Sequence, residues 1–227
     1  TTEIYTLSLH DALPIFLLTH EHSDHTAGLK VLCGSLRLPL YCNRLTADCL
    51  RHNLPHFDGW RLFNTGDRLA IGDLAVETFS VPHDANDPVG FVIEHAEARV
   101  GFLTDIGHPT ELAIERVRRC HAILLEANHD LDLLQNDTRR PWPVKQRILS
   151  RHGHLSNAGA AELVRRVLHD DLSHIFLGHL SPDCTTPELA LATIGAVLDA
   201  LGARDRIRLL AACQDRPSER VAIGPAR

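Results

Sequence analysis

Three histidines and two carboxylates lie within six consecutive residues, His20 to His25, near the start of the chain. They follow a short apolar run, residues 15–18, of the kind that forms a strand buried on both faces. Because residues two apart in an extended segment point to the same side, His20 and His22 can share one metal ion. Asp24 and His25 come after the turn and are expected to point elsewhere, which suits a second ion beside the first.

This combination of side chains indicates metal-dependent hydrolysis. Neutral imidazole and carboxylate are the usual zinc ligands, and a catalytic zinc site leaves one position open for water. Two divalent ions about 3.5–4 Å apart can bridge a hydroxide, lower its pKa and stabilise charge on a phosphoryl or carbonyl oxygen. The alternative is a set of surface histidines on a polar turn, which explains a lone histidine better than the whole string.

Three later segments place a residue of metal-ligand type directly after a predicted strand. His83 follows residues 74–81, Asp105 follows residues 99–104, and His179 follows residues 175–177. Open α/β sheets place their ligands at the carboxyl ends of the strands. These three residues are therefore candidates to complete the site.

The remaining pattern predicts one layered α/β domain, because strand pairs alternate with covering helices. Strands are expected at residues 15–18, 38–42, 68–71, 74–81, 89–95, 99–104, 122–125, 175–177 and 206–211. Helices are expected at residues 26–32, 44–52, 110–119, 142–151, 156–169 and 187–201, the last capped by Thr186.

The charge, hydrophobicity and cysteine content of the chain disfavour some classes of function. The 227 residues carry a net charge of −6, so there is no global basic field to attract nucleic acid, although bound divalent ions supply positive charge locally. No apolar run approaches the roughly 18 residues of a membrane span, and no membrane partner is expected. The six cysteines form no C-x-x-C pair, which indicates a reducing, cytoplasmic compartment.

The first fifteen residues are unlike the rest. The chain contains no methionine, and residues 1–15 have no basic segment that would mark a signal peptide. They resemble translated sequencing adapter, so we expect native protein to begin near Phe16. Residues 1–15 are interpreted as a non-native leader and residues 16–227 as the hydrolase domain.

The motif His-x-His-x-Asp-His, with the three later ligand types in order, resembles the metallo-β-lactamase superfamily. The resemblance implies an αββα sandwich, here lacking its first strands. It also implies two divalent metal ions, for which zinc fits best and manganese or iron are alternatives. The implied ligands are His20, His22 and His83 for one ion, Asp24, His25 and His179 for the other, and Asp105 as the bridge.

Further segments resemble the YycJ/WalJ-like branch of this superfamily. They are Glu126-Ala-Asn-His129-Asp130, Pro141-Trp-Pro-Val-Lys145-Gln-Arg147, His152-Gly-His154-Leu-Ser-Asn157 and His179-Leu-Ser181. The resemblance implies phosphodiester hydrolysis, by 5′-to-3′ exonuclease action on double-stranded DNA. One departure is Cys184-Thr185, where the branch usually carries two asparagines.

Candidate substrate and proton-transfer residues lie in the same segments. A basic cluster could bind backbone phosphates, although a solvated helix face explains such a cluster equally well. Its members are Arg139, Arg140, Lys145, Arg147 and Arg151. Lys145, Arg147 and His152 are the predicted substrate contacts. His154, with His152 as an alternative, is the predicted general acid, and Asp24 is the second candidate catalytic residue. His129 is a candidate to orient a ligand.

Two other functions remain open on the same residues. One is hydrolysis of a small ester, thioester or lactone by the same metal site. The other is an inactive fragment whose sheet is incomplete. A β-lactamase is disfavoured because no signature of a lactam pocket is visible.

Overall fold

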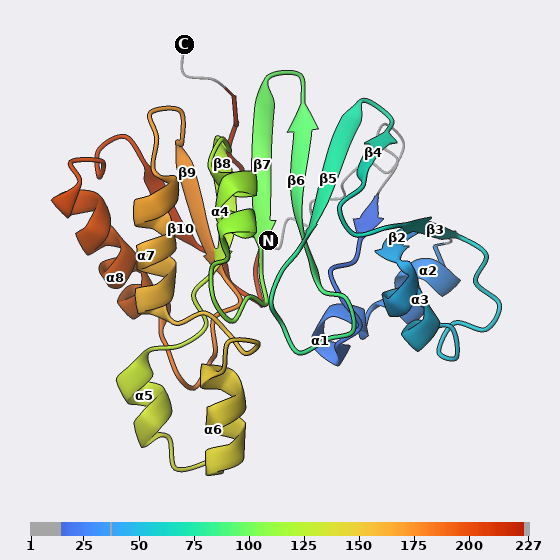
Figure 1. Cartoon of the computed structure of the whole chain (residues 1–227), viewed down its shortest axis with the longest axis horizontal. Helices are drawn as coiled ribbons and strands as arrows, with labels where there is room; N and C mark the ends of the chain where they lie inside the picture. The colour runs from blue at the N-terminus through green and yellow to red at the C-terminus, as the bar shows by residue number, and fades with distance from the viewer. Residues whose placement is uncertain (1–14, 37, 225–227) are drawn as a thin grey trace, which may run out of the picture. The chain divides into compact units, whose positions relative to one another are not determined.

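The computed structural model describes residues 15–36 and 38–224, which fall into two compact units. The N-terminal unit runs to Thr65 and also includes Ala85–Asp87; the C-terminal unit comprises Gly66–Asp84 and the chain from Pro88 onward (Figure 1). The predicted leader lies outside the described residues except for Ile15. The single-domain organisation stays a prediction.

The N-terminal unit contains a parallel sheet of three strands in the order β1-β2-β3. Its elements are β1 (Phe16–Leu17), α1 (Ser23–Thr26), α2 (Leu29–Gly34), β2 (Leu40–Asn43), α3 (Arg44–Leu50) and β3 (Trp60–Phe63). Leu18, Leu40 and Cys42 belong to its buried core. Asn43 begins α3 because its side chain accepts a hydrogen bond from the Thr46 amide, which would otherwise lack a helical partner.

Three features of this unit differ from the sequence predictions. Strand β1 is only half-buried, so the prediction of burial on both faces is wrong. The helix predicted over residues 26–32 is replaced by α1 and α2, with a break at Ala27 and Gly28. Strand β3 was not predicted, because its four residues do not alternate in polarity and only pairing with β2 defines them as a strand.

The C-terminal unit contains a seven-stranded sheet in the order β10-β9-β8-β7-β6-β5-β4 within the described residues. Its strands are β4 (Arg68–Ile71), β5 (Leu74–Ser80), β6 (Val89–His95), β7 (Ala98–Leu103), β8 (Ala122–Glu126), β9 (His174–Gly178) and β10 (Arg208–Ala211). Its helices are α4 (Glu111–Val117), α5 (Leu131–Asn136), α6 (Trp142–Leu149), α7 (Asn157–Val167) and α8 (Pro187–Ala200). These bounds confirm the predicted elements of this region to within a few residues.

Pairing fixes the direction of each strand in this sheet. Strands β5, β6 and β7 are successively antiparallel, whereas β7, β8 and β9 are parallel. Strands β5, β7, β8 and β9 therefore run in the same direction and end at the same edge. Helices α4, α7 and α8 cover one face of the sheet and enclose the larger core (Figure 1).

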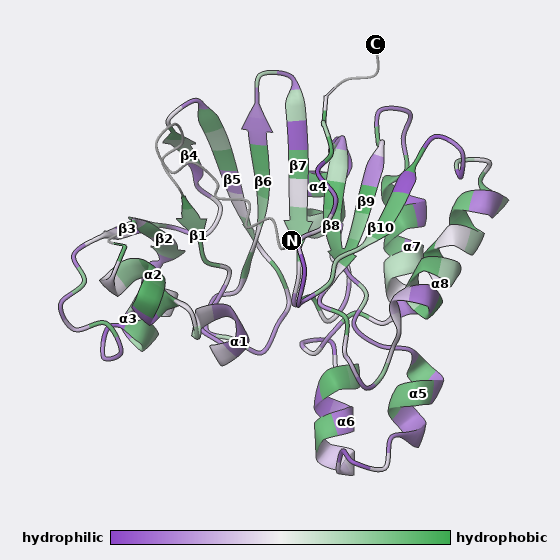
Figure 2. Cartoon of the chain, turned by 180° about the vertical axis from the view of Figure 1, so that it is seen from behind, coloured by the Kyte–Doolittle hydropathy of each residue, from purple (hydrophilic) through white to green (hydrophobic). Residues whose placement is uncertain are grey.

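Helix α5 was missed from the sequence, and it lies with α6 beyond the edge where these strands end (Figure 1). Asp130 caps α5, since its Oδ1 accepts hydrogen bonds from the amides of Asp132 and Leu133, each at 3.0 Å. Both helices carry hydrophobic residues (Figure 2), and Leu131, Leu133 and Trp142 are exposed. In the part of the chain that is described, no helix combines the length and hydropathy that a membrane crossing requires.

Candidate metal and catalytic site

The predicted motif of the N-terminal unit is a compact cluster of imidazoles. His20 is fully buried, and its ring centroid lies 4.5 Å from that of His22 and 4.3 Å from that of His25. The Thr19 hydroxyl lies 3.0 Å from His20 Nδ1 and 3.3 Å from His25 Nδ1. A single threonine therefore orients two of the predicted ligands.

Local structure explains why the histidines meet. Helix α1 starts directly after His22, and the Thr26 hydroxyl donates a hydrogen bond to the His22 carbonyl at 2.9 Å. This turn brings the His25 ring beside that of His20, and the assignment of His25 to a second ion stays a prediction. The Asp24 side chain is 60% exposed and lies 3.5 Å from His25 Nε2. Glu21 does not join the cluster, because its carboxylate accepts hydrogen bonds from the backbone and side chain of Asn86.

In the C-terminal unit, the candidate residues stand at the ends of four of the strands that share a direction. His83 follows β5, Asp105 follows β7, Glu126 ends β8, and His179 follows β9. Asp105 and His179 adopt φ angles of 55° and 54°. Such left-handed conformations cost about 1–3 kcal/mol each in non-glycine residues and cluster at functional sites.

Asp105 lies at the centre of this group. Its Oδ1 is 3.4 Å from His179 Nε2, 3.7 Å from His83 Nε2 and 3.8 Å from His154 Nδ1. The carboxylate is 2% exposed, so it sits in a low-dielectric environment among three imidazoles. This is the residue that the family resemblance implies as the bridge between two ions.

His83 is held by the loop that precedes α7. Its Nδ1 donates a hydrogen bond to the Gly153 carbonyl at 2.9 Å, so the lone pair of the neutral ring is on Nε2. Burial lowers the pKa of His83, although the nearby Asp105 charge opposes this shift. The neutral form that results is the form that binds a metal ion.

Glu126 was not among the predicted site residues, yet it organises two of them. It is fully buried, and its Oε1 lies 2.8 Å from His154 Nδ1 and 2.8 Å from His179 Nδ1. Its Oε2 accepts hydrogen bonds from the amides of Ile106 at 2.8 Å and Leu155 at 3.2 Å. Both histidines thus present Nε2 as the second functional nitrogen.

Hydrogen bonding keeps Glu126 ionised despite its burial. Burial raises the pKa of the carboxyl, but hydrogen bonds from His154 and His179 outweigh that effect and hold it below its ordinary value. The sequence does contain a signal for this residue, because a carboxylate ending an apolar strand needs partners. Those partners come from distant loops and cannot be read from the strand itself.

The donor set of the C-terminal unit fits a divalent metal ion. Four residues each offer a ligand atom, and these atoms all lie within 4.8 Å of one another: Asp105, Glu126, His154 and His179. Imidazole nitrogens and carboxylate oxygens are the donors that zinc, manganese and iron accept. This unit therefore contains a cluster able to hold a divalent ion.

The predicted substrate residues differ in their surroundings. Lys145 is 8% exposed, and its ammonium donates a hydrogen bond to the Gln135 carbonyl at 2.7 Å, joining α6 to α5. That internal contact argues against the predicted phosphate contact. Arg147 forms an ion pair with Asp84, whose other oxygen lies 3.5 Å from His83 Nε2. His152 is exposed in the loop between α6 and α7.

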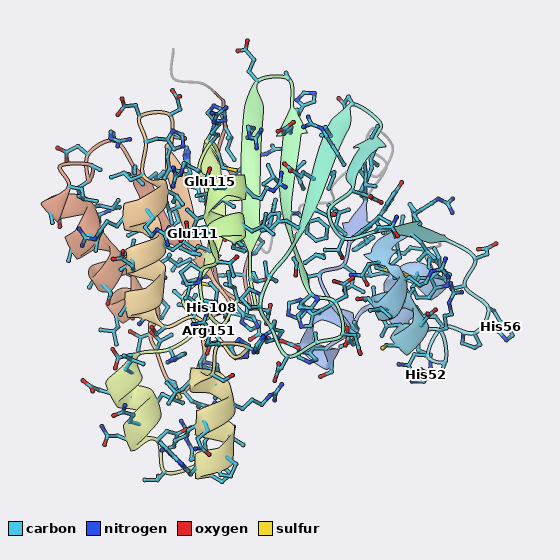
Figure 3. All side chains as sticks on the ribbon, viewed as in Figure 1. His52, His56, His108, Glu111, Glu115 and Arg151 are labelled. Atoms are coloured by element: carbon cyan, nitrogen blue, oxygen red, sulfur yellow. The ribbon has the colours of Figure 1, made fainter. Side chains whose placement is uncertain are left out.

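The rest of the predicted basic cluster is paired. Arg139 and Arg140 both form ion pairs with Asp137 and Asp183. Hydrogen bonds from the backbone of Arg139 and the side chain of Arg140 hold the pKa of Asp137 well below its usual range. Arg151 Nη2 lies 2.6 Å from His108 Nε2, and Figure 3 shows these two side chains next to each other. Carboxylates therefore neutralise Arg139 and Arg140, whereas Arg151 keeps its positive charge.

His129 is buried without the expected hydrogen bond to a metal ligand. It is 1% exposed, and within the described residues neither ring nitrogen has a hydrogen-bond partner. Burial lowers its pKa to about 4, so the ring is neutral near pH 7. Thr185, at the departure from the branch pattern, accepts a hydrogen bond from Asn157 at 2.8 Å.

Comparison with known proteins supports one family. Residues 6–175 match the model of the beta-lactamase superfamily domain. The exodeoxyribonuclease YycJ of Bacillus anthracis is 37% identical over 86% of this chain and 74% of its own length. The exodeoxyribonuclease WalJ of Streptococcus pneumoniae serotype 2 is 36% identical over 80% of this chain and 69% of its own length.

Solved structures agree on the fold. The metallo-beta-lactamase fold protein YhfI from Bacillus subtilis superposes with a TM-score of 0.66 at 15% identity, covering 87% of this chain and 74% of its own. Zn(2+)-bound PqqB from Methylobacterium extorquens gives a TM-score of 0.59 at 20% identity, covering 87% of this chain and 70% of its own. The chain thus has the metallo-β-lactamase fold and belongs to the beta-lactamase superfamily.

Proposed function

We propose that this chain is a metal-dependent exodeoxyribonuclease that degrades double-stranded DNA in the 5′-to-3′ direction. The proposal rests on a sequence identity of 36–37% to two proteins named exodeoxyribonucleases, over at least four-fifths of the chain. The buried cluster around Asp105 and Glu126 supports it, because a divalent ion held there would stabilise the negative charge that develops in phosphodiester hydrolysis.

We assign two divalent ions to the seven predicted ligands. One would be held by His20, His22 and His83, the other by Asp24, His25 and His179, with Asp105 shared between them. When bound, the ions would supply Lewis acidity and a water of lowered pKa. Zinc suits this set of nitrogen and carboxylate donors best, and manganese and iron are the alternatives.

The side chains of the protein itself would position the substrate and move protons. His154 is our general acid, which protonates the leaving oxygen from Nε2. The Glu126 carboxylate would stabilise the imidazolium through Nδ1–H, as it lies 2.8 Å from that nitrogen. Asp24, which is largely exposed, would accept a proton from the attacking water as well as serve as a ligand.

Arg147 and His152 are the proposed contacts with DNA. Arg147 pairs with Asp84 beside His83, so a backbone phosphate could replace Asp84 as its partner. His152 is exposed in the neighbouring loop and can approach the same phosphates. We assign Lys145 a structural role instead, because its ammonium is already engaged by the Gln135 carbonyl.

A reducing location is part of the proposal. All six cysteines are free thiols. Burial raises the pKa of Cys42 to about 12 and that of Cys120 to about 11, which makes both thiols unreactive. A DNA substrate and unoxidised thiols together favour the cytoplasm.

Metal content and DNA cleavage test this proposal together. We expect about two metal ions per chain by elemental analysis, and release of nucleotides from 5′-phosphorylated duplex DNA. Asp105→Asn, which keeps the size of the side chain, should lose metal and activity. The matched control His56→Ala removes an exposed histidine outside the motif and should retain both (Figure 3).

The competing function predicts a different result. A metal-loaded protein that hydrolyses a thioester or lactone but leaves duplex DNA intact would overturn the nuclease assignment and favour a small-molecule hydrolase. A folded chain that binds no metal ion would overturn the ligand assignment.

A further inference from the structure

A cavity of about 190 Å³ opens in the C-terminal unit next to His154. Its wall combines the loop that follows β7, the first residue of α5, the last residue of α6 and the loop that leads into α7. His154, which contacts Glu126 and lies near Asp105, forms part of this wall. A ligand in the cavity would therefore be adjacent to the proposed reaction site.

The cavity contains a polar group that the protein does not satisfy. His129 lines the wall and is 1% exposed, and neither of its ring nitrogens has a hydrogen-bond partner within the described residues. Buried polar groups in native proteins are nearly always hydrogen-bonded, so an unsatisfied one requires an explanation. A neutral imidazole offers one donor and one acceptor on opposite sides of the ring, so the edge of one ligand can pair with one of these two nitrogens.

The chemistry of the wall selects the ligand. The described lining contains no lysine, arginine, aspartate or glutamate, and its apolar part includes Leu131, Leu149 and Leu155. The nearby Arg151 is engaged by His108. A phosphate would meet no lysine or arginine in the lining itself, although the guanidinium of Arg151 lies beside His108 of that lining. A planar heteroaromatic ring with a hydrogen-bonding edge matches both the apolar surfaces and His129.

Size points to the same class of ligand. Pockets for drug-sized molecules begin at about 300 Å³, so a cavity of about 190 Å³ suits a single small ring system. Enzymes that act on nucleic acids hold individual bases in this way, by apolar contact on the ring faces and hydrogen bonds at the edge.

We propose that this cavity binds the nucleobase of the terminal nucleotide while its phosphate reacts beside His154. The identity of the ligand rests on the proposed nuclease function, whereas a preference for a base can be measured without any cleavage. His129 is the contact for the edge of the base, and Leu131 and Leu149 contact its faces.

Calorimetry on the metal-loaded protein tests the cavity directly. Deoxyadenosine 5′-monophosphate and deoxyribose 5-phosphate share the same sugar and phosphate and differ by the base. We expect the nucleotide to bind about tenfold more tightly, in line with the contribution of a stacked base. Equal affinity for the two compounds would overturn the proposal.

Variants locate that preference in the cavity. Leu149→Trp fills the cavity from a residue that is 37% exposed, so the fold should tolerate it and the base preference should disappear. Leu133→Trp is the matched control, since Leu133 is 42% exposed on α5 and does not line the cavity, and it should keep the preference. His129→Phe should weaken it and His129→Asn, which restores a donor and an acceptor, should recover it. Loss of the base preference in Leu133→Trp, or its retention in Leu149→Trp, would contradict the assignment of the base to this cavity.

Exonuclease assays separate this proposal from the proposed function. On duplexes with a normal or an abasic 5′-terminal nucleotide, the wild type should show a KM about tenfold lower for the normal end. Cleavage of both ends with the same KM would overturn the base pocket and leave the nuclease intact. Base-selective binding without any DNA cleavage would support the base pocket and overturn the nuclease function.

Discussion

The two units build their candidate site residues in opposite ways. In the N-terminal unit, four candidate ligands lie within six consecutive residues, and local contacts such as Thr26 to His22 hold them. In the C-terminal unit, contacts between segments distant in the sequence hold the candidate residues. His83 donates a hydrogen bond to a carbonyl 70 residues away, and Glu126 contacts a histidine 53 residues away.

This difference predicts how each half responds to damage. A local motif depends on a few neighbouring residues, so a substitution there should affect metal binding more than folding. A distributed site depends on the buried groups that join its loops, so a substitution there should affect both.

The largest effect is expected at Glu126. Glu126→Ala leaves two imidazoles and two amides without their buried acceptor, and should cost about 4 kcal/mol of unfolding free energy as well as metal binding. Urea denaturation measures the first and elemental analysis the second. Glu115→Ala, at an exposed glutamate of α4, should cost below about 0.5 kcal/mol (Figure 3). A Glu126→Ala protein as stable as the wild type would remove the distinction between the two units.

Glycine substitutions provide a second contrast. A Cβ at Gly153 would lie 2.1 Å from the Ile148 carbonyl oxygen, and this glycine also accepts the His83 hydrogen bond. We expect Gly153→Ala to cost about 3 kcal/mol by overpacking and to weaken metal binding. Gly34→Ala, in α2 of the N-terminal unit, meets no atom within 4 Å and should leave stability equal or slightly higher. Thermal unfolding measures both changes in stability. A Gly153→Ala protein as stable as the wild type, or a strongly destabilised Gly34→Ala protein, would contradict the expected contrast.

Acid should destabilise the C-terminal unit through His129. Its folded pKa of about 4 lies below the ordinary 6.5, so between these values the unfolded chain takes up a proton that the folded protein excludes. Stability is therefore full above pH 6.5 and falls as the pH decreases, by about 2 kcal/mol at pH 5. Urea unfolding at pH 7 and 5 should show a smaller decrease in His129→Phe and an unchanged one in His56→Ala. An identical decrease in His129→Phe would disprove this origin.

The smallest effect on stability is expected in the local motif. Thr19→Val removes the hydroxyl that lies beside His20 and His25. The loss should be about 1 kcal/mol in unfolding free energy but about tenfold in metal affinity, because the hydroxyl orients the ligands. Competition with a chelator measures the affinity. A large loss of stability with normal affinity would contradict the contrast between the units.

Sequence patterns were sufficient where neighbouring residues determine the structure. The predicted strands at His83, Asp105 and His179 are confirmed, because apolar runs and turns are local features. The role of Glu126 was missed because its four partners come from three loops that are distant in the sequence. The burial of Lys145 was missed because charge alone does not reveal an internal acceptor such as Gln135.

The shared direction of β5, β7, β8 and β9 has a consequence for the evolution of substrate range. Every group at the strand ends is anchored to the sheet, whereas α5 and α6 lie in the connection between β8 and β9. The α5–α6 segment of that connection can be lengthened, shortened or exchanged while the sheet, its carboxylates and the following loop with Gly153 and His154 stay in place. A change of specificity therefore requires only a new insertion between two strands, and grafting this insertion between relatives is a direct route to new substrates.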